Sequence, residues 1–148
     1  MNKTFYIILS LLCLNFFNTS YPQDNFNGNA NNIQKNESSK VFSDIQKGIA
    51  NKDVESIARY FSSQTYLSLS NGISGYYSSN QAYYVLEDFF KVYRVTAFRF
   101  DNIQPGSNNP YATGEYQFNY RGKRDLAQVY IALKKTGKNW KITQITIN

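Results

Sequence analysis

The stretch AYYVLEDFFKVYRVTAFRFD, residues 82–101, changes its hydrophobic period halfway along. Before Arg94 the apolar residues recur every three or four positions, as on one face of a helix. They are Ala82, Val85, Leu86, Phe89, Phe90 and Tyr93. After Arg94, Thr96, Phe98 and Phe100 alternate with their neighbours, as along a strand. Ser78 and Gln81 stand just before the helical stripe with the spacing of a capping box, so we predict a capped helix that leads directly into a strand.

Similar patterns extend in both directions from this stretch. Towards the N-terminus we predict helices over about 41–50 and from Asp53, followed by a short strand at 66–70. Towards the C-terminus we predict long strands at 111–120, 126–134 and 140–147, separated by polar turns. This order indicates an α+β fold, with N-terminal helices packed on a curved antiparallel sheet of about four long strands plus a short one.

The last strand contains a phase slip. Trp140 and Ile142 have one parity, whereas Ile145 and Ile147 have the other. A bulge near Thr143 and Gln144 would return all four side chains to one face of the sheet.

The N-terminal region has the composition of a secretory signal peptide. Lys3 precedes an apolar run from Phe5 to Phe17 that is too short to span a membrane. We therefore predict a signal peptide at 1–22 that is removed, a disordered Asn-rich spacer at 23–40, and a folded domain at 41–148. Leu12 precedes Cys13 where a lipoprotein signal has a small residue, so we expect a periplasmic or extracellular protein without a lipid anchor or a transmembrane anchor in the mature chain.

The composition excludes several kinds of chemistry. The chain of 148 residues has no His and one Cys, which rules out a Ser-His-Asp triad, a Cys-His pair and a Cys-cluster zinc site. We predict no metal and no cofactor. The formal charge of +6 permits an acidic partner, but we interpret the basic clusters at 121–124 and 134–141 as solvated edges and not as a nucleic-acid surface.

Several short sequence motifs match the pattern of one protein family. They are Ile49-Ala50-Asn51-Lys52-Asp53, Tyr60-Phe61, Gly75-Tyr76-Tyr77-Ser78, Gln81-Ala82 with Leu86 and Phe89-Phe90, Val129 to Lys135, and Trp140 to Ile145. Together they resemble the DUF4783 family of small exported proteins, found mainly in Bacteroidetes, over residues 41–148. The resemblance implies the NTF2-like (cystatin-like cone) fold. It implies no activity, because this superfamily includes isomerases, dehydratases, transport factors and binding modules.

The charged residues provide little evidence for a catalytic site. Arg99 and Asp101 share a strand face opposite to Phe98 and Phe100, so we interpret them as an exposed ion pair. Asp88 lies beside core positions of the helix. Of its two possible locations, the mouth of the cone and the helix surface, we favour the helix surface. An enzyme of the cone pocket, an isomerase or lyase with a carboxylate base and a Tyr donor, is the alternative function.

Aromatic residues are more numerous than one small core obviously needs. Tyr116, Phe118 and Tyr120 alternate along one strand, and we expect them on a sheet face that pairs with another protein. Our candidate pocket or interface residues are Tyr76, Tyr77, Asp88, Arg99, Tyr116, Phe118, Tyr120 and Tyr130. We therefore predict a non-catalytic module of the cell envelope that binds a small apolar ligand or a protein, with a homodimer through the sheet face left open.

Overall fold

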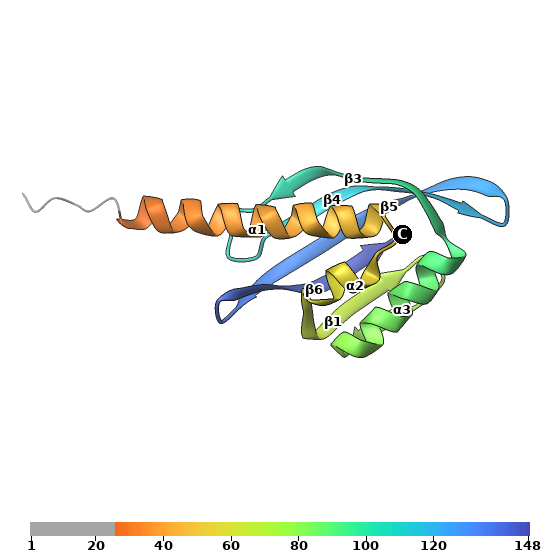
Figure 1. Ribbon diagram of the computed structural model, residues 1–148, viewed down its shortest axis with the longest axis horizontal. Coiled ribbons are helices and arrows are strands. Elements are labelled where there is room, and N and C mark those ends of the chain that lie inside the picture. The colour runs from red at the N-terminus through yellow and green to blue at the C-terminus, as the bar shows by residue number, and fades with distance from the viewer. Residues whose placement is uncertain (1–25) are drawn as a thin grey trace, which may run out of the picture.

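The structure is a computed structural model that describes residues 26–148. The predicted signal peptide lies outside the described residues. Three helices, α1 (Phe26–Ala50), α2 (Val54–Ala58) and α3 (Ser79–Val92), lie on one face of a single sheet (Figure 1). The strands are β1 (Phe61–Leu69), β2 (Ser74–Tyr77), β3 (Arg94–Gln104), β4 (Tyr111–Tyr120), β5 (Lys123–Thr136) and β6 (Asn139–Ile147). None of the helices in residues 26–148 is long and apolar enough to cross a membrane.

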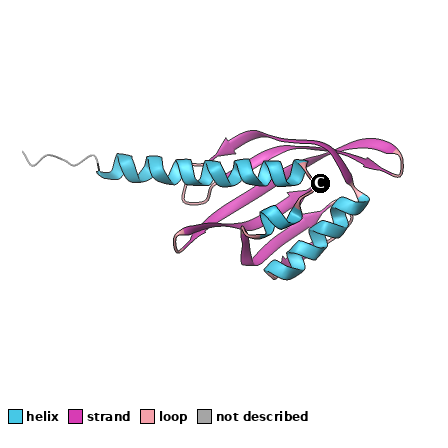
Figure 2. Cartoon of the chain, in the orientation of Figure 1, coloured by secondary structure: helices cyan, strands magenta, loops and turns pink. Residues whose placement is uncertain are grey.

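The six strands follow the order β2-β1-β6-β5-β4-β3. Of the neighbouring strands, only β1 and β6 pair in parallel, and the other pairs are antiparallel. The predicted α+β architecture is confirmed, with the helices segregated to one side of the sheet (Figure 2). The short strand predicted at 66–70 is the second half of a longer β1, and the chain adds β2 before α3.

The predicted capping box at the start of α3 is confirmed. Ser78 accepts a hydrogen bond from the Gln81 backbone N–H, and Gln81 Oε1 accepts one from the Ser78 backbone N–H at 3.0 Å. The buried side chains of α3 are Ala82, Leu86, Phe89 and Phe90. α3 therefore enters the structure with its apolar stripe turned towards the sheet.

Bulges adjust the side-chain pattern of two strands. In β6, Ala132 pairs with Gln144 but Leu133 pairs with Ile142, so Thr143 is the extra residue and the predicted bulge is confirmed. Trp140, Ile142, Ile145 and Ile147 are all buried as a result. In β3, the shift between Val95 and Ala97 buries Val95 and Phe98 and leaves Thr96 exposed, so the prediction that Thr96 shares a face with Phe98 is wrong.

Helix α1 begins 15 residues before the predicted domain start, so the prediction of a disordered spacer is wrong for residues 26–40. Two polar contacts hold this helix against β3 and the turn that follows it. The buried Ser38 donates a hydrogen bond to the Pro105 carbonyl at 2.6 Å, and Gln46 Oε1 accepts one from the Phe100 backbone N–H at 2.7 Å. Asn-rich composition concealed the helix, because Asn has low helix propensity and the early turns are mostly exposed.

Candidate functional site

The space between the helices and the sheet is filled by aromatic side chains. Phe90 stacks on Tyr116 with ring centroids 5.9 Å apart, and Phe89 stacks on Tyr93 at 4.6 Å. Tyr116 is fully buried, and its hydroxyl donates a hydrogen bond to the Tyr93 carbonyl at 2.5 Å. Burial raises the pKa of Tyr116 far above its ordinary value, so this hydroxyl stays protonated and anchors the start of β3.

Two of our predicted interface residues are core residues. Tyr116 and Phe118 lie on the helix-facing side of β4 with Ala112, and all three are buried. The expectation that they present a protein-binding surface is therefore wrong. Tyr120, at the end of the same strand, is half-buried and stacks on Tyr93 at 4.8 Å. The alternation was identified correctly, but the aromatic face of β4 is the face against which the helices bury their apolar stripes.

The predicted charged residues lie at the surface. Asp88 accepts a hydrogen bond from Lys91 Nζ at 3.1 Å, and its side chain is 75% exposed. Arg99 and Asp101 form the expected exposed ion pair, with 3.2 Å between nitrogen and oxygen. Exposed pairs of this kind contribute little stability and do not create a reactive site.

No Asp or Glu among residues 26–148 is buried. The two carboxylates that contact a tyrosine hydroxyl are Asp44, at 2.6 Å from Tyr60, and Glu87, at 3.4 Å from Tyr83. The hydrogen bond from Tyr60 lowers the pKa of Asp44, and neighbouring Lys40 and Arg59 act in the same direction. Asp44 is thereby held as a carboxylate, whereas a general base needs a pKa raised towards neutrality. Among the described residues, no group of His, Cys, Asp or Glu is arranged to hold a metal ion.

The sheet face that the helices leave uncovered carries four tyrosines in two pairs; we call it the outer face. Tyr66 and Tyr76 pack edge to face with ring centroids 5.1 Å apart. Tyr111 and Tyr130 stack at 5.7 Å with 25° between their ring planes. Strand pairing places Gln144 and Ala132 in one cross-strand row between Tyr66 and Tyr111. This row of Tyr66, Gln144, Ala132 and Tyr111 is thus aromatic and polar without charge.

The rest of this face contains polar residues and one exposed leucine. Gln144 donates a hydrogen bond to Thr146 at 3.2 Å, and Gln117 donates one to Glu115 at 2.7 Å. Leu126 pairs with Gln117 and is 51% exposed. Among the charged residues, Lys134 and Arg124 lie near the ends of β5, whereas Arg99 lies midway along the edge strand β3 and pairs with Glu115 of β4. An uncharged centre with a charged rim is the usual distribution at protein interfaces.

The structure separates the predicted tyrosines. Tyr76 and Tyr130 lie on the outer face, whereas the neighbouring Tyr77 packs against the core. Sequence reasoning missed Tyr66 and Tyr111. The position of Tyr111 could have been found from the sequence. Counting back across the turn at 121–122 pairs Ala132 with Tyr111 and Tyr130 with Thr113, which places Tyr111 and Tyr130 on the same face of the sheet.

The likeness to known proteins concerns the fold and the family. The chain is similar to a DUF4783 family protein from Bacteroides uniformis, at 15% identity and a TM-score of 0.65, over 72% of this chain and 94% of that one. It is also similar to a protein of unknown function with a cystatin-like fold from Nostoc punctiforme, at 17% identity and a TM-score of 0.58, covering 78% and 90%. A putative scytalone dehydratase from Novosphingobium aromaticivorans matches at 15% identity and a TM-score of 0.60, covering 82% and 87%.

At such identities these likenesses show the fold alone, which is the NTF2-like or cystatin-like fold. No curated protein matches the sequence. The model of the DUF4783 family, described as a domain of unknown function, matches residues 42–148, nearly the whole described domain. The chain therefore belongs to the DUF4783 family.

Proposed function

We propose that this DUF4783 domain is exported through its N-terminal signal sequence and works in the periplasm or outside the cell as a non-catalytic interaction module. Its partner is a second copy of the chain, which binds through the outer face. The observation that carries the proposal is the pair of tyrosine clusters, Tyr66 with Tyr76 and Tyr111 with Tyr130, on a sheet face that α1, α2 and α3 leave uncovered.

The size of the outer face supports a second copy as the occupant. Neighbouring strands lie about 4.8 Å apart, so six strands give a width of roughly 24 Å, and the 14 residues of β5 extend about 45 Å. Such a face exceeds the ~800 Å² that each partner buries in a typical stable interface. Tyrosine, glutamine and threonine side chains both donate and accept hydrogen bonds, so two copies of this surface are chemically complementary.

The alternatives receive less support. A small apolar ligand would need the space that Phe89, Phe90 and Tyr116 occupy between helices and sheet. A cone-pocket enzyme would need a desolvated carboxylate beside a tyrosine, whereas the Asp44–Tyr60 pair lies among cations and Asp44 is held ionised. The fold likeness to a putative dehydratase does not supply the missing base.

Sedimentation velocity over a range of protein concentrations tests the proposal. We expect a dimer for the wild-type protein and a monomer for Tyr130→Lys, because this change removes the ring that stacks on Tyr111 and places a charge beside the uncharged row of the outer face. Tyr84→Lys is the matched control, since Tyr84 is 62% exposed on α3, on the helix side of the molecule. A wild-type monomer at all concentrations, or equal dissociation by both variants, would contradict the proposal. The export part is tested separately, by fractionating cells that express the whole chain and measuring the mass of the mature N-terminus.

A further inference from the structure

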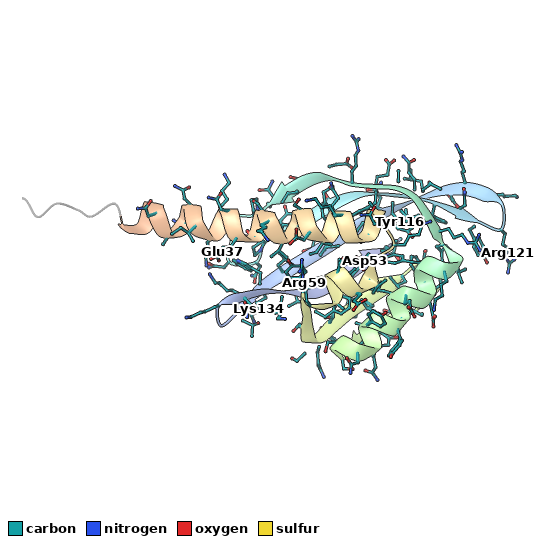
Figure 3. The ribbon with its side chains drawn as sticks, viewed as in Figure 1. Glu37, Asp53, Arg59, Tyr116, Arg121 and Lys134 are labelled. Carbon is teal, nitrogen blue, oxygen red and sulfur yellow. The ribbon has the colours of Figure 1, made fainter. Side chains whose placement is uncertain are left out.

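A groove at the end of the molecule marked by the β5–β6 turn is lined by cations; we call it the basic groove. It lies between α1, the junction of α2 with β1, and the β5–β6 turn, and its volume is about 500 Å³. Glu37 and Arg59 lie on the same side of the molecule as Lys134, and Arg121 is at the opposite end (Figure 3). The residues that line the basic groove are Glu37, Lys40, Val41, Arg59, Tyr60, Lys138, Asn139, Trp140 and Lys141.

Contacts across the β1–β6 junction fix the wall of the basic groove. Lys141 Nζ donates a hydrogen bond to the Arg59 carbonyl at 2.7 Å, and the Ile142 backbone N–H donates one to the Tyr60 carbonyl at 2.6 Å. The Arg59 guanidinium lies over the Tyr60 ring, 4.8 Å from its centroid. These contacts hold Arg59 and Lys141 in place before any ligand arrives, which lowers the entropic cost of binding.

The carboxylates of this region do not balance its cations. Asp44 is shared between Lys40 at 3.6 Å and Arg59 at 3.3 Å. Glu37 pairs with Lys135 at 3.1 Å. Within residues 26–148, no ion pair involves Lys138 or Lys141. Positive charge therefore remains in a groove that several elements line, where it attracts anions.

One buried donor beside the groove lacks an acceptor. Trp140 is 4% exposed, and its indole Nε1 has no hydrogen-bond partner among the described residues. Lys135 Nζ lies 5.5 Å from the centroid of the Trp140 ring. A buried N–H without an acceptor costs free energy and is rare in folded proteins. Because Trp140 lines the groove, its indole N–H resonance is a reporter for a ligand bound there.

We propose that the basic groove binds a phosphoryl dianion, as carried by a phosphate monoester. Such a group offers several acceptor oxygens and a charge that matches the unpaired cations, and Arg and Lys donors bind it with charge-assisted hydrogen bonds. The rings of Tyr60 and Trp140 provide apolar contact for the organic part of the ester. The basic groove contains none of the four tyrosines of the outer face, so the proposal stands whether or not the chain dimerises.

Trp140 is the only tryptophan of the chain and provides a direct readout. Inorganic phosphate is added to the ¹⁵N-labelled full chain at constant ionic strength, with sodium chloride as the matched salt. We expect a saturable shift of the single indole N–H resonance with phosphate and none with chloride. The absence of a saturable shift with phosphate would overturn the proposal.

A pair of charge-neutralised variants tests the location. Lys40→Gln with Lys138→Gln removes two groove cations, and we expect phosphate to bind about tenfold more weakly or worse. The control is Arg121→Gln with Lys123→Gln, which removes the same charge at the opposite end of the molecule, where both residues are exposed. Equal weakening by the two pairs would overturn the groove as the binding site.

Two further probes distinguish the sources of the phosphoryl group. Glycerol phosphate represents a soluble ester, and co-sedimentation with phosphatidic acid vesicles, compared with phosphatidylcholine vesicles, represents a lipid. We expect at least one of these probes to bind the wild-type chain, and to bind the double variant Lys40→Gln/Lys138→Gln more weakly. If neither probe binds in this way, the phosphate monoester is the wrong ligand class and the proposal fails.

Discussion

Individual tyrosines of this chain perform different tasks that their sequence positions do not reveal. Tyr116 is buried and ties β4 to the Tyr93 carbonyl, whereas Tyr130, on the next strand, stacks on Tyr111 on the outer face. Tyr60 donates its hydrogen bond to a carboxylate, and burial and the contact with Asp44 both raise its pKa. The immediate partner of each hydroxyl, and not the residue type, determines what each tyrosine contributes.

Tyr60→Phe is expected to remove a stabilising contact of Asp44 in a pH-dependent way. The hydrogen bond from Tyr60 lowers the pKa of Asp44 in the folded state, so its stabilisation is present above the unfolded pKa and is lost as the pH falls through the folded pKa. We expect a loss of about 1–2 kcal/mol at pH 7. The loss should shrink as the pH falls below 3.8, the ordinary pKa of an Asp side chain.

Urea unfolding of the wild-type protein and the variant at several pH values measures this. Tyr66→Phe is the control, because the Tyr66 hydroxyl bonds to Ser74, a neutral partner, at 2.9 Å. A pH-independent loss for Tyr60→Phe would show that Asp44 is not the group involved.

Gly114 has a steric role where β4 passes the bulged part of β3. A Cβ at this position would lie against the Arg99 carbonyl oxygen and 2.8 Å from Phe100 Cα, both of them backbone atoms. We expect Gly114→Ala to destabilise the fold by about 1–3 kcal/mol or more, because the backbone would have to move. Gly106→Ala, where a Cβ meets nothing within 4 Å, should change the melting temperature little. Equal effects of the two changes in thermal unfolding would refute this account of Gly114.

At the scale of elements, the sequence predicted what local patterns determine. The capped helix α3, the hairpin strands β4 to β6 and the bulge at Thr143 follow from period, caps and turns. The parallel pairing of β1 with β6 could not be predicted, because its partners, such as Leu67 and Ile145, are far apart in the chain. The first half of α1 was missed for a related reason: its contacts with the β3–β4 turn are tertiary.

Ser38→Ala tests whether that tertiary contact holds α1 in place. The hydroxyl is buried and bonds to the Pro105 carbonyl, which would lose this donor. We expect a loss of about 1–2 kcal/mol in chemical unfolding and faster amide exchange in residues before Ser38. Ser43→Ala, at an exposed position of the same helix, should be nearly neutral. If the two variants behave alike, the Ser38 contact does not anchor the helix.

At the scale of the whole molecule, aromatic packing determines which face is available for binding. Helices cover one side of the sheet (Figure 1). Tyr116 and Phe118 are buried between these helices and the sheet, and so they are not part of a binding surface. Of the predicted site, Tyr76 and Tyr130 lie on the outer face, where Tyr66 and Tyr111 complete the two pairs. Parity alone could not choose between the faces of β4, because both of its sides contain aromatic residues.

Alanine methyl resonances of the wild-type protein, recorded as its concentration is raised, test the central claim most directly. Ala132 lies in the middle of the outer face, whereas Ala112 and Ala127 are buried on the helix side. We predict that the Ala132 methyl signal shifts with concentration while those of Ala112 and Ala127 stay in place. An unchanged Ala132 signal over the whole range, or shifts confined to the two buried methyl groups, would contradict the claim that the protein acts through its outer sheet face.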